Sequence, residues 1–153
     1  MNKLSEQLDI GDNYLRSDIC ALMGKSYEKD AIERGIYKPK FFDSVILFST
    51  LKNESGYINF QLDEKHYIFS GKRNFNDTNL INHYMNGYEL LLFIRETQET
   101  GFYYYGSSKY CGEAINLEIV AKMLKIYQLP FYIVELLETT LSKVSEIHIP
   151  KIQ

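Results

Sequence analysis

Three short apolar runs in close succession constrain the fold of this chain more than any other feature of its sequence. They cover residues 44–51, 56–62 and 66–71, and the polar turns KNES and DEK separate them. Their β-branched and aromatic residues favour strands, and short polar turns connect neighbouring antiparallel strands. We therefore expect three successive antiparallel strands in the middle of the chain.

Two short helices are expected on either side of these strands. Residues 14–25 have apolar residues at helical spacing, with Ser17 as a candidate cap and Gly24 at the end. Residues 76–87 predict a second helix that is capped by Asn76 or Asp77 and stopped by a left-handed Gly87. The apolar face of this second helix would consist of Leu80, Ile81 and Tyr84.

The remaining segments complete an α+β pattern. Residues 88–96 and 101–107 predict a hairpin, 116–127 a helix and 131–136 a strand, whereas the glycine and proline of 34–40 predict a loop. Five to seven mostly antiparallel strands with two or three helices would enclose one core if the sheet curves strongly. We expect an α+β fold built on a small curved β-barrel.

Length and composition are those of a single soluble domain. The 153 residues suit one domain spanning 1–153, with a core over about 14–136. No apolar run approaches the roughly 18 residues of a membrane span, and the N-terminus lacks the apolar stretch of a signal peptide. Cys20 and Cys111 are the only cysteines. A reduced, cytoplasmic protein is the simplest interpretation.

The sequence holds no catalytic motif, and we expect no catalytic residue, metal or cofactor. His66, His83 and His148 are the only histidines, and none lies in a hydrolase, metalloprotease or nucleotide-binding motif. A nuclease cluster of Asp63, Glu64 and Lys65 is disfavoured, because adjacent residues of a turn point apart. These charges are typical of a solvated turn.

Charge is unevenly distributed along this slightly acidic chain. The net charge is −3, yet residues 34–83 carry 7 basic and 5 acidic side chains. In SGKRNFND, residues 70–77, a strand, a glycine, two cations and a helix start follow one another, and this order suits a phosphate cradle. The loop RGIYKPK, residues 34–40, repeats the combination of glycine, aromatic and cations. Both segments would equally suit ordinary solvated loops.

Eight short motifs taken in order resemble a known family: YLRSDI, RGIYKP, VILFST, GYINF, HYIFSG, NHYMNG, LLLFIRE and FYYYGS. Over residues 14–107 the chain resembles the SRA-like, PUA-superfamily readers of modified DNA that accompany McrA-type HNH endonucleases and superfamily 2 helicases. A similar domain forms the target-recognition end of SauUSI-type modification-dependent restriction enzymes. The chain departs from several relatives at Asn59, where they carry an acidic residue, and at Lys72 and Arg73, where a second glycine is common.

The resemblance implies recognition of 5-methylcytosine that is flipped out of double-stranded DNA into an aromatic pocket. Five cations would hold the flanking phosphates: Arg34, Lys38, Lys40, Lys72 and Arg73. Seven residues would form the modified-base pocket: Tyr37, Tyr67, Phe69, Ser70, Asn74, Asp77 and Tyr104. Within that pocket Tyr67 and Phe69 share one strand face, and Tyr104 would oppose them. The domain would serve nuclease and helicase modules, in cis or in trans.

Two other functions remain open from the sequence. The sulfur-binding members of the same superfamily accept a phosphorothioate through an apolar contact, which Tyr37 and Pro39 would supply here. Alternatively, the chain is a protein-interaction module whose tyrosine-rich surface binds a partner protein, as its acidic net charge favours. The response of DNA affinity to salt separates these classes.

Overall fold

The computed structural model describes residues 2–24, 35–52, 59–71, 77–97, 99–113 and 131–137. Some predictions lie outside these ranges. They are the phosphate contacts Arg34, Lys72 and Arg73, the pocket residue Asn74, and the helix over residues 116–127.

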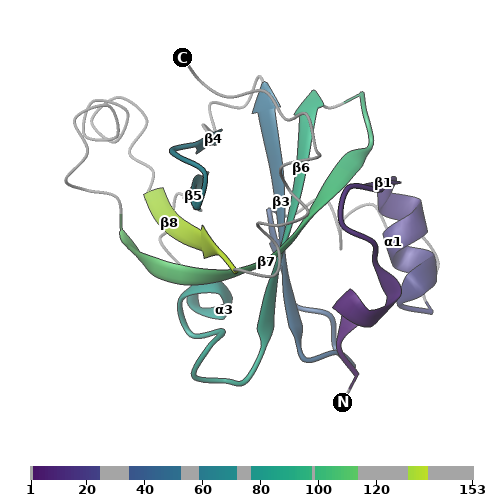
Figure 1. The fold of residues 1–153 in the computed structure, drawn as a ribbon. Helices are drawn as coiled ribbons and strands as arrows, with labels where there is room; N and C mark the ends of the chain where they lie inside the picture. Colours follow the sequence, from purple (N-terminus) through teal and green to yellow (C-terminus); the bar gives the residue numbers. More distant parts are fainter. Residues whose placement is uncertain are drawn as a thin grey trace.

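One mixed sheet dominates the structure (Figure 1). Its strands are β1 (Asn13–Tyr14), β2 (Ile36–Tyr37), β3 (Ser44–Lys52), β4 (Phe60–Gln61), β5 (His66–Ser70), β6 (Glu89–Thr97), β7 (Phe102–Glu113) and β8 (Phe131–Leu136). The strand order is β2-β3-β6-β7-β8-β5-β4, with β1 paired to β7. The described helices are the 3-10 turn η1 (Leu4–Gln7), α1 (Arg16–Leu22) and the single turn α3 (Thr78–Ile81). The α+β class is confirmed.

The central strand β3 does not pair with the strand that follows it. It pairs in parallel with β6, from Ser44 opposite Glu89 to Lys52 opposite Thr97, and antiparallel with β2. Only β4 and β5 form the expected antiparallel pair, so the prediction of three successive antiparallel strands was wrong. The physical reason is burial, because residues 44–49 of β3 are all buried and a strand covered on both faces suits the middle of a sheet.

Two irregularities in β7 bend the sheet. The first half of β7 pairs with β6 and the second half with β8. Tyr105 and Cys111 are extra residues in these ladders, and the glycine after each has a positive φ, 96° at Gly106 and 129° at Gly112. Such bulges turn and twist a strand, which carries β8, β5 and β4 away from the β3–β6 half in Figure 1.

The curled sheet is open, which corrects the expectation of a closed barrel. In the strand order β2 and β4 are the two ends, and no ladder joins them among the described residues. The described residues form eight strands where five to seven were expected. The two-residue strand β2 lies within the predicted loop over 34–40, and the two-residue strand β1 joins the sheet near the N-terminus. Side-chain hydrogen bonds connect β5 to β3 across the curl, as between Tyr67 and Ser49.

Two apolar clusters pack on opposite faces of the sheet. The cluster inside the curl contains Ile36, Val45, Leu47, Tyr67, Phe69, Leu80, Leu90, Leu92, Ile94, Tyr105, Tyr132, Val134 and Leu136. The outer cluster packs η1 and α1 against the β3–β6–β7 part of the sheet, with Leu4, Leu8, Ile19, Cys20, Ile46, Phe48, Leu91, Phe93, Phe102 and Tyr104. The fold is therefore covered on both faces of its central strands.

The helices are shorter than predicted. Helix α1 begins at Arg16, and the carboxylate of Asp18, not Ser17, accepts the N–H of Leu15 at 2.8 Å. In α3 only Leu80 reaches the core, whereas Ile81 and Tyr84 are exposed, because the helix ends after one turn.

The predicted stops are correct. Gly24 and Gly87 have φ values of 71° and 75°, a conformation that glycine adopts without steric cost. In the part of the chain that the structure describes, no helix has the length and apolar character needed to cross a membrane.

Candidate nucleic-acid interface

The side chain of Asn59 connects β5 to β3, two strands that are not neighbours in the sheet. Its Oδ1 accepts hydrogen bonds from the N–H of Ser70 at 2.9 Å and from the hydroxyl of Ser70 at 3.1 Å. Its Nδ2 donates to the carbonyl oxygen of Thr50 at 3.2 Å. Asn59 and Ser70 are both buried. The amide therefore fastens the end of β5 to the end of β3, and a carboxylate in its place would lack the N–H donor.

A glycine contact brings a second segment to the same place. A Cβ atom on Gly35 would lie 3.4 Å from Cζ of Phe69, and the carbonyl of Gly35 accepts the N–H of Phe48 at 2.7 Å. Gly35 directly follows Arg34, and Gly71, the residue after β5, directly precedes Lys72. The chain positions that flank the two predicted phosphate loops therefore meet at the Asn59 clamp, which we define as Asn59, Thr50, Ser70, Phe69 and Gly35.

Tyrosine hydroxyls make further bonds across the inside of the curl. The hydroxyl of Tyr67 lies 2.6 Å from Oγ of Ser49, and that of Tyr105 donates to Oε1 of Gln61 at 3.0 Å. Burial raises the pKa of Tyr67, and it raises the pKa of Tyr105 to about 12. Both phenols therefore stay protonated and hold β3, β5, β4 and β7 together as neutral hydrogen-bonding groups.

Asp77 is buried, and its side chain accepts a hydrogen bond from the hydroxyl of Tyr132, a residue of the inner cluster, at 2.7 Å. Burial, together with the bond to Asp77, raises the pKa of Tyr132. Asp77 also stands at the N-cap position of α3, although its side chain makes no capping bond. Its carboxylate thus connects the start of α3 to β8.

The predicted pocket residues fall into two groups. Tyr67 and Phe69 belong to the inner cluster, so their shared face is confirmed, and Asp77 bonds to Tyr132 of the same cluster. Ser70 follows Phe69 at the end of β5 and bonds to Asn59. Tyr104 is instead part of the outer cluster, with its ring centroid 5.1 Å from that of Phe93. The structure does not bring Tyr104 to Tyr67, because the bulge in β7 places the neighbouring Tyr105 inside the curl.

The loop over residues 38–42 holds Lys38 inward. Its ammonium donates to the carbonyl of Pro39 at 2.6 Å and to that of Phe42, and it lies 4.5 Å from the ring centroid of Tyr88. Burial lowers the pKa of Lys38, opposed by the charge of Asp43. These contacts make Lys38 a structural group in this conformation.

Three residues next to Lys38 in the sequence differ in exposure. Lys40 is exposed, with its ammonium 5.7 Å from the ring centroid of Phe41. Tyr37 is half-buried against the outer cluster, and Pro39 is buried. Of the predicted phosphate contacts that the structure describes, Lys40 is therefore the one oriented toward solvent.

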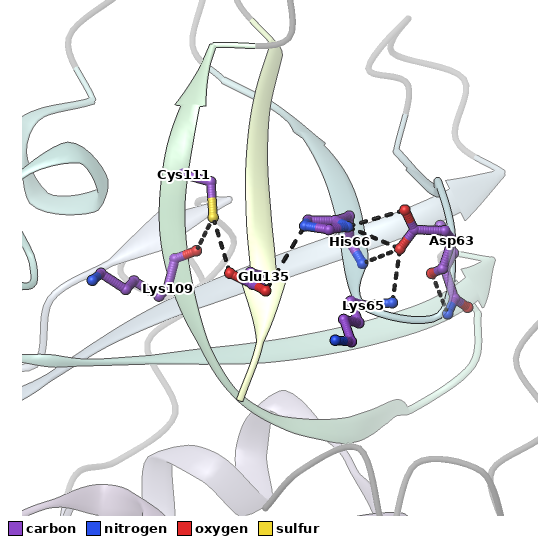
Figure 2. Close-up of polar contacts among 7 residues, drawn as sticks. Asp63, Lys65, His66, Lys109, Cys111 and Glu135 are labelled. Carbon is purple, nitrogen blue, oxygen red and sulfur yellow. Dashed lines mark hydrogen bonds and ion pairs between the residues drawn. The ribbon is translucent and has the colours of Figure 1, made fainter. Parts of the chain in front are cut away.

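A polar row crosses the outer face of β5, β8 and β7 (Figure 2). Nδ1 of His66 lies 2.9 Å from Oδ1 of Asp63, Nε2 of His66 lies 4.0 Å from Oε1 of Glu135, and Sγ of Cys111 lies 3.7 Å from Oε2 of Glu135. Burial and the charge of Glu135 raise the pKa of the Cys111 thiol. Because Glu135 separates the sulfur from the imidazole, the row lacks the thiolate–imidazole pair of a cysteine nucleophile.

The described residues contain no group of three or more His, Cys, Asp or Glu side chains arranged to hold a metal ion.

The sequence analysis missed three residues whose side chains make buried hydrogen bonds between strands: Asn59, Gln61 and Tyr105. The available signal was the amide at position 59, where several of the SRA-like domains named in the resemblance carry an acidic residue.

Comparison with known proteins gives no assignment. No protein-family model matches the chain, and no curated protein matches it at a significant level.

Proposed function

We propose that this chain reads a modified base in double-stranded DNA, with 5-methylcytosine as the ligand that its resemblance to SRA-like domains favours. It would act as the recognition module of a nuclease or helicase, in cis or in trans. The observation that carries the proposal is the Asn59 clamp, where the residues flanking two cation-bearing segments meet in space. Cations from two loops at one place would track a phosphate backbone.

The inner residues would take different parts in this function. Phe69 and Ser70 end β5, so they would lie nearest a flipped base. Tyr67 and Asp77 would hold Phe69 and Ser70 in place through their own bonds to Ser49 and Tyr132. Flipping costs a few kcal/mol of stacking and pairing. A binding pocket that is already rigid offsets this cost more easily than one that must first become ordered.

A protein-interaction module is the second candidate, and one observation favours it. Tyr84 and Met85, in the turn after α3, are 68% and 87% exposed, and Ile81 and Leu137 are also exposed apolar residues. Such side chains are enriched in protein interfaces. A phosphorothioate reader has less support, since Pro39 is buried and Tyr37 half-buried.

The proposal is tested by removing the two cations after Gly71. The variant Lys72→Ala/Arg73→Ala should bind duplex DNA more weakly, and the slope of log affinity against log salt should fall by about 2, because two phosphate contacts are lost. The measurement is fluorescence anisotropy at several salt concentrations.

Lys65→Ala/Lys109→Ala is the matched control, since both lysines are exposed, Lys65 in the turn before β5 and Lys109 in β7 (Figure 2). It should keep the wild-type slope. Equal losses in the two variants would mean non-specific attraction, and no binding of the wild-type chain at low salt would favour the protein partner.

A further inference from the structure

A groove of about 340 Å³ lies between the turn that follows α3 and the neighbouring parts of β6 and β7. Its lining includes Lys3, Tyr84, Tyr88, Glu89, Lys109 and Leu137. Glu89 begins β6 and pairs with Ser44 at the start of β3, whereas Thr50 of the Asn59 clamp pairs with Arg95 six residues further along β6. The groove therefore lies at the other end of the β3–β6 pair from the clamp, about 20 Å away along the strands.

Large apolar side chains are exposed at this groove on a well-held turn. Tyr84 and Leu137 line it and are exposed, and Met85, next to Tyr84 in the sequence, is more exposed still. The base of the turn is fixed, because the N–H of Tyr88 donates to the carbonyl of His83 at 2.8 Å and Nδ1 of His83 bonds to the carbonyl of Tyr88 at 2.9 Å. Tyrosine and methionine presented in this way are typical of protein interfaces.

Two lysines place positive charge beside these apolar side chains. The ammonium of Lys109 lies 4.0 Å from the ring centroid of Tyr84. Lys109 is opposite Glu135 in the β7–β8 ladder, but its side chain points away from that carboxylate, which contacts Cys111 instead (Figure 2). Lys3 is exposed, and within the described ranges its ammonium makes no hydrogen bond or ion pair. The contact between Lys109 and Tyr84 limits the rotamers of both, so less entropy is lost on binding.

The remaining ionisable groups of the lining leave this charge in excess. Glu89 supplies the carboxylate, and its Oε2 already accepts hydrogen bonds from the N–H of Ser5 at 3.1 Å and from the hydroxyl of Ser44 at 2.6 Å. His83 is neutral, because its Nε2 accepts the N–H of Tyr110 and burial lowers its pKa. Two ammonium groups against one carboxylate that is bonded to the protein make the groove complementary to acidic groups.

We propose that this groove binds an acidic segment of a partner protein. Apolar side chains of the segment would cover Tyr84, Met85 and Leu137, and its carboxylates would lie beside Lys3 and Lys109. A nucleic-acid backbone would use the two cations but leave the apolar side chains in water, so the observations favour a protein. The site does not depend on the modified-base pocket, and a partner bound here leaves the Asn59 clamp accessible.

The test uses the whole chain and a displayed library of random peptides from which binders are selected. Tyr84→Ser removes the exposed ring and Lys109→Glu reverses one charge, both at exposed positions where substitution has little effect on folding. Tyr103→Ser and Lys65→Glu are the matched controls, because they make the same changes at exposed positions outside the groove lining. Thermal melting checks that every variant is folded.

The selected peptides should combine Asp or Glu with Leu, Phe or Met. For one such peptide, the apparent Kd measured by anisotropy should rise about tenfold in Tyr84→Ser and in Lys109→Glu, and stay within about twofold of wild type in both controls. Excess unlabelled DNA duplex should leave the peptide Kd unchanged, because the clamp lies at the other end of the strands.

Three results would overturn the proposal: selection of no acidic peptide, equal losses in the groove variants and their controls, or displacement of the peptide by the duplex. The last result would assign the groove to nucleic acid. Failure of the chain to bind any duplex would refute the DNA proposal alone, because peptide binding at the groove is measured without DNA.

Discussion

The hydroxyl of Tyr67 lies 2.6 Å from Oγ of Ser49, and this contact joins β5 to β3 across the inside of the curled sheet. No backbone ladder links these two strands among the described residues. Side-chain bonds of this kind therefore act together with the bulges of β7 to hold the open sheet in its curled form.

Tyr67→Phe should lower the free energy of unfolding by about 1–2 kcal/mol, because it leaves the buried hydroxyl of Ser49 without this bond. Urea denaturation measures the change. Ser49→Ala/Tyr67→Phe should cost less than the sum of the single substitutions, since both polar partners are then removed.

Tyr103→Phe is the control for this prediction, because Tyr103 is 42% exposed and should change stability by less than about 0.5 kcal/mol. Additive effects of the two single substitutions would show that the Tyr67–Ser49 contact does not couple the strands.

Lys38 and Lys40 should respond differently to the same substitution. Lys38→Ala removes bonds to the carbonyls of Pro39 and Phe42 and should lower stability by about 1–3 kcal/mol, with the salt slope of DNA binding unchanged. Lys40→Ala should leave stability within about 0.5 kcal/mol and reduce the salt slope by about 1. Thermal melting and anisotropy separate the two effects, and the reverse pattern would place Lys38 in the interface.

His83 should make the protein less stable as the pH falls. Its Nδ1 donates to the carbonyl of Tyr88 at 2.9 Å, and its Nε2 accepts the N–H of Tyr110 at 3.1 Å. Burial lowers the pKa of His83 below its ordinary value of 6.5, so the unfolded chain binds the proton more tightly. The stabilisation is complete above about pH 6.5 and is lost as the pH falls below it.

His83→Gln should flatten the stability profile between about pH 7 and pH 5, although it lowers stability at pH 7. His66→Gln is the control, and its stability should still decrease as the pH falls, because His83 is unchanged in this variant. An equally steep profile in His83→Gln would assign the pH dependence to other groups.

Cys111 should react with iodoacetamide more slowly than an ordinary exposed thiol. Burial and the neighbouring carboxylate raise its pKa, and the thiolate is the reactive form. Glu135→Gln removes the negative charge and should increase the alkylation rate severalfold at pH 8, as followed by mass spectrometry. Cys20 is buried and serves as the internal control in the same protein. An unchanged rate would mean that Glu135 does not affect the thiol.

The strands themselves could be predicted from local patterns, but their partners could not. The runs at 44–51, 88–96 and 131–136 are strands within one residue of the expected bounds. The parallel pairing of β3 with β6 joins residues 45 positions apart, as at Ser44 and Glu89, and no turn motif encodes it. The bulge at Tyr105 likewise depends on how β7 passes from β6 to β8, which alternation alone does not reveal.

Local patterns likewise could not predict which site residues lie close together. Alternation placed Tyr67 and Phe69 on one face, but it gave no information on which face of β7 would meet them. Tyr104 was therefore expected where Tyr105 lies. The inward position of Lys38 depends on the carbonyls of Pro39 and Phe42 and on the ring of Tyr88, contacts that the composition of the loop does not specify.

Recognition of modified DNA is tested most directly by an anisotropy titration of this chain, at low and moderate salt, with three duplexes of one sequence: unmodified, 5-methylcytosine and phosphorothioate. We expect salt-sensitive binding that is selective for the 5-methylcytosine duplex. Selective binding of the phosphorothioate duplex would keep the fold and change the ligand. Equal or absent binding of all three duplexes would contradict a reader of modified DNA.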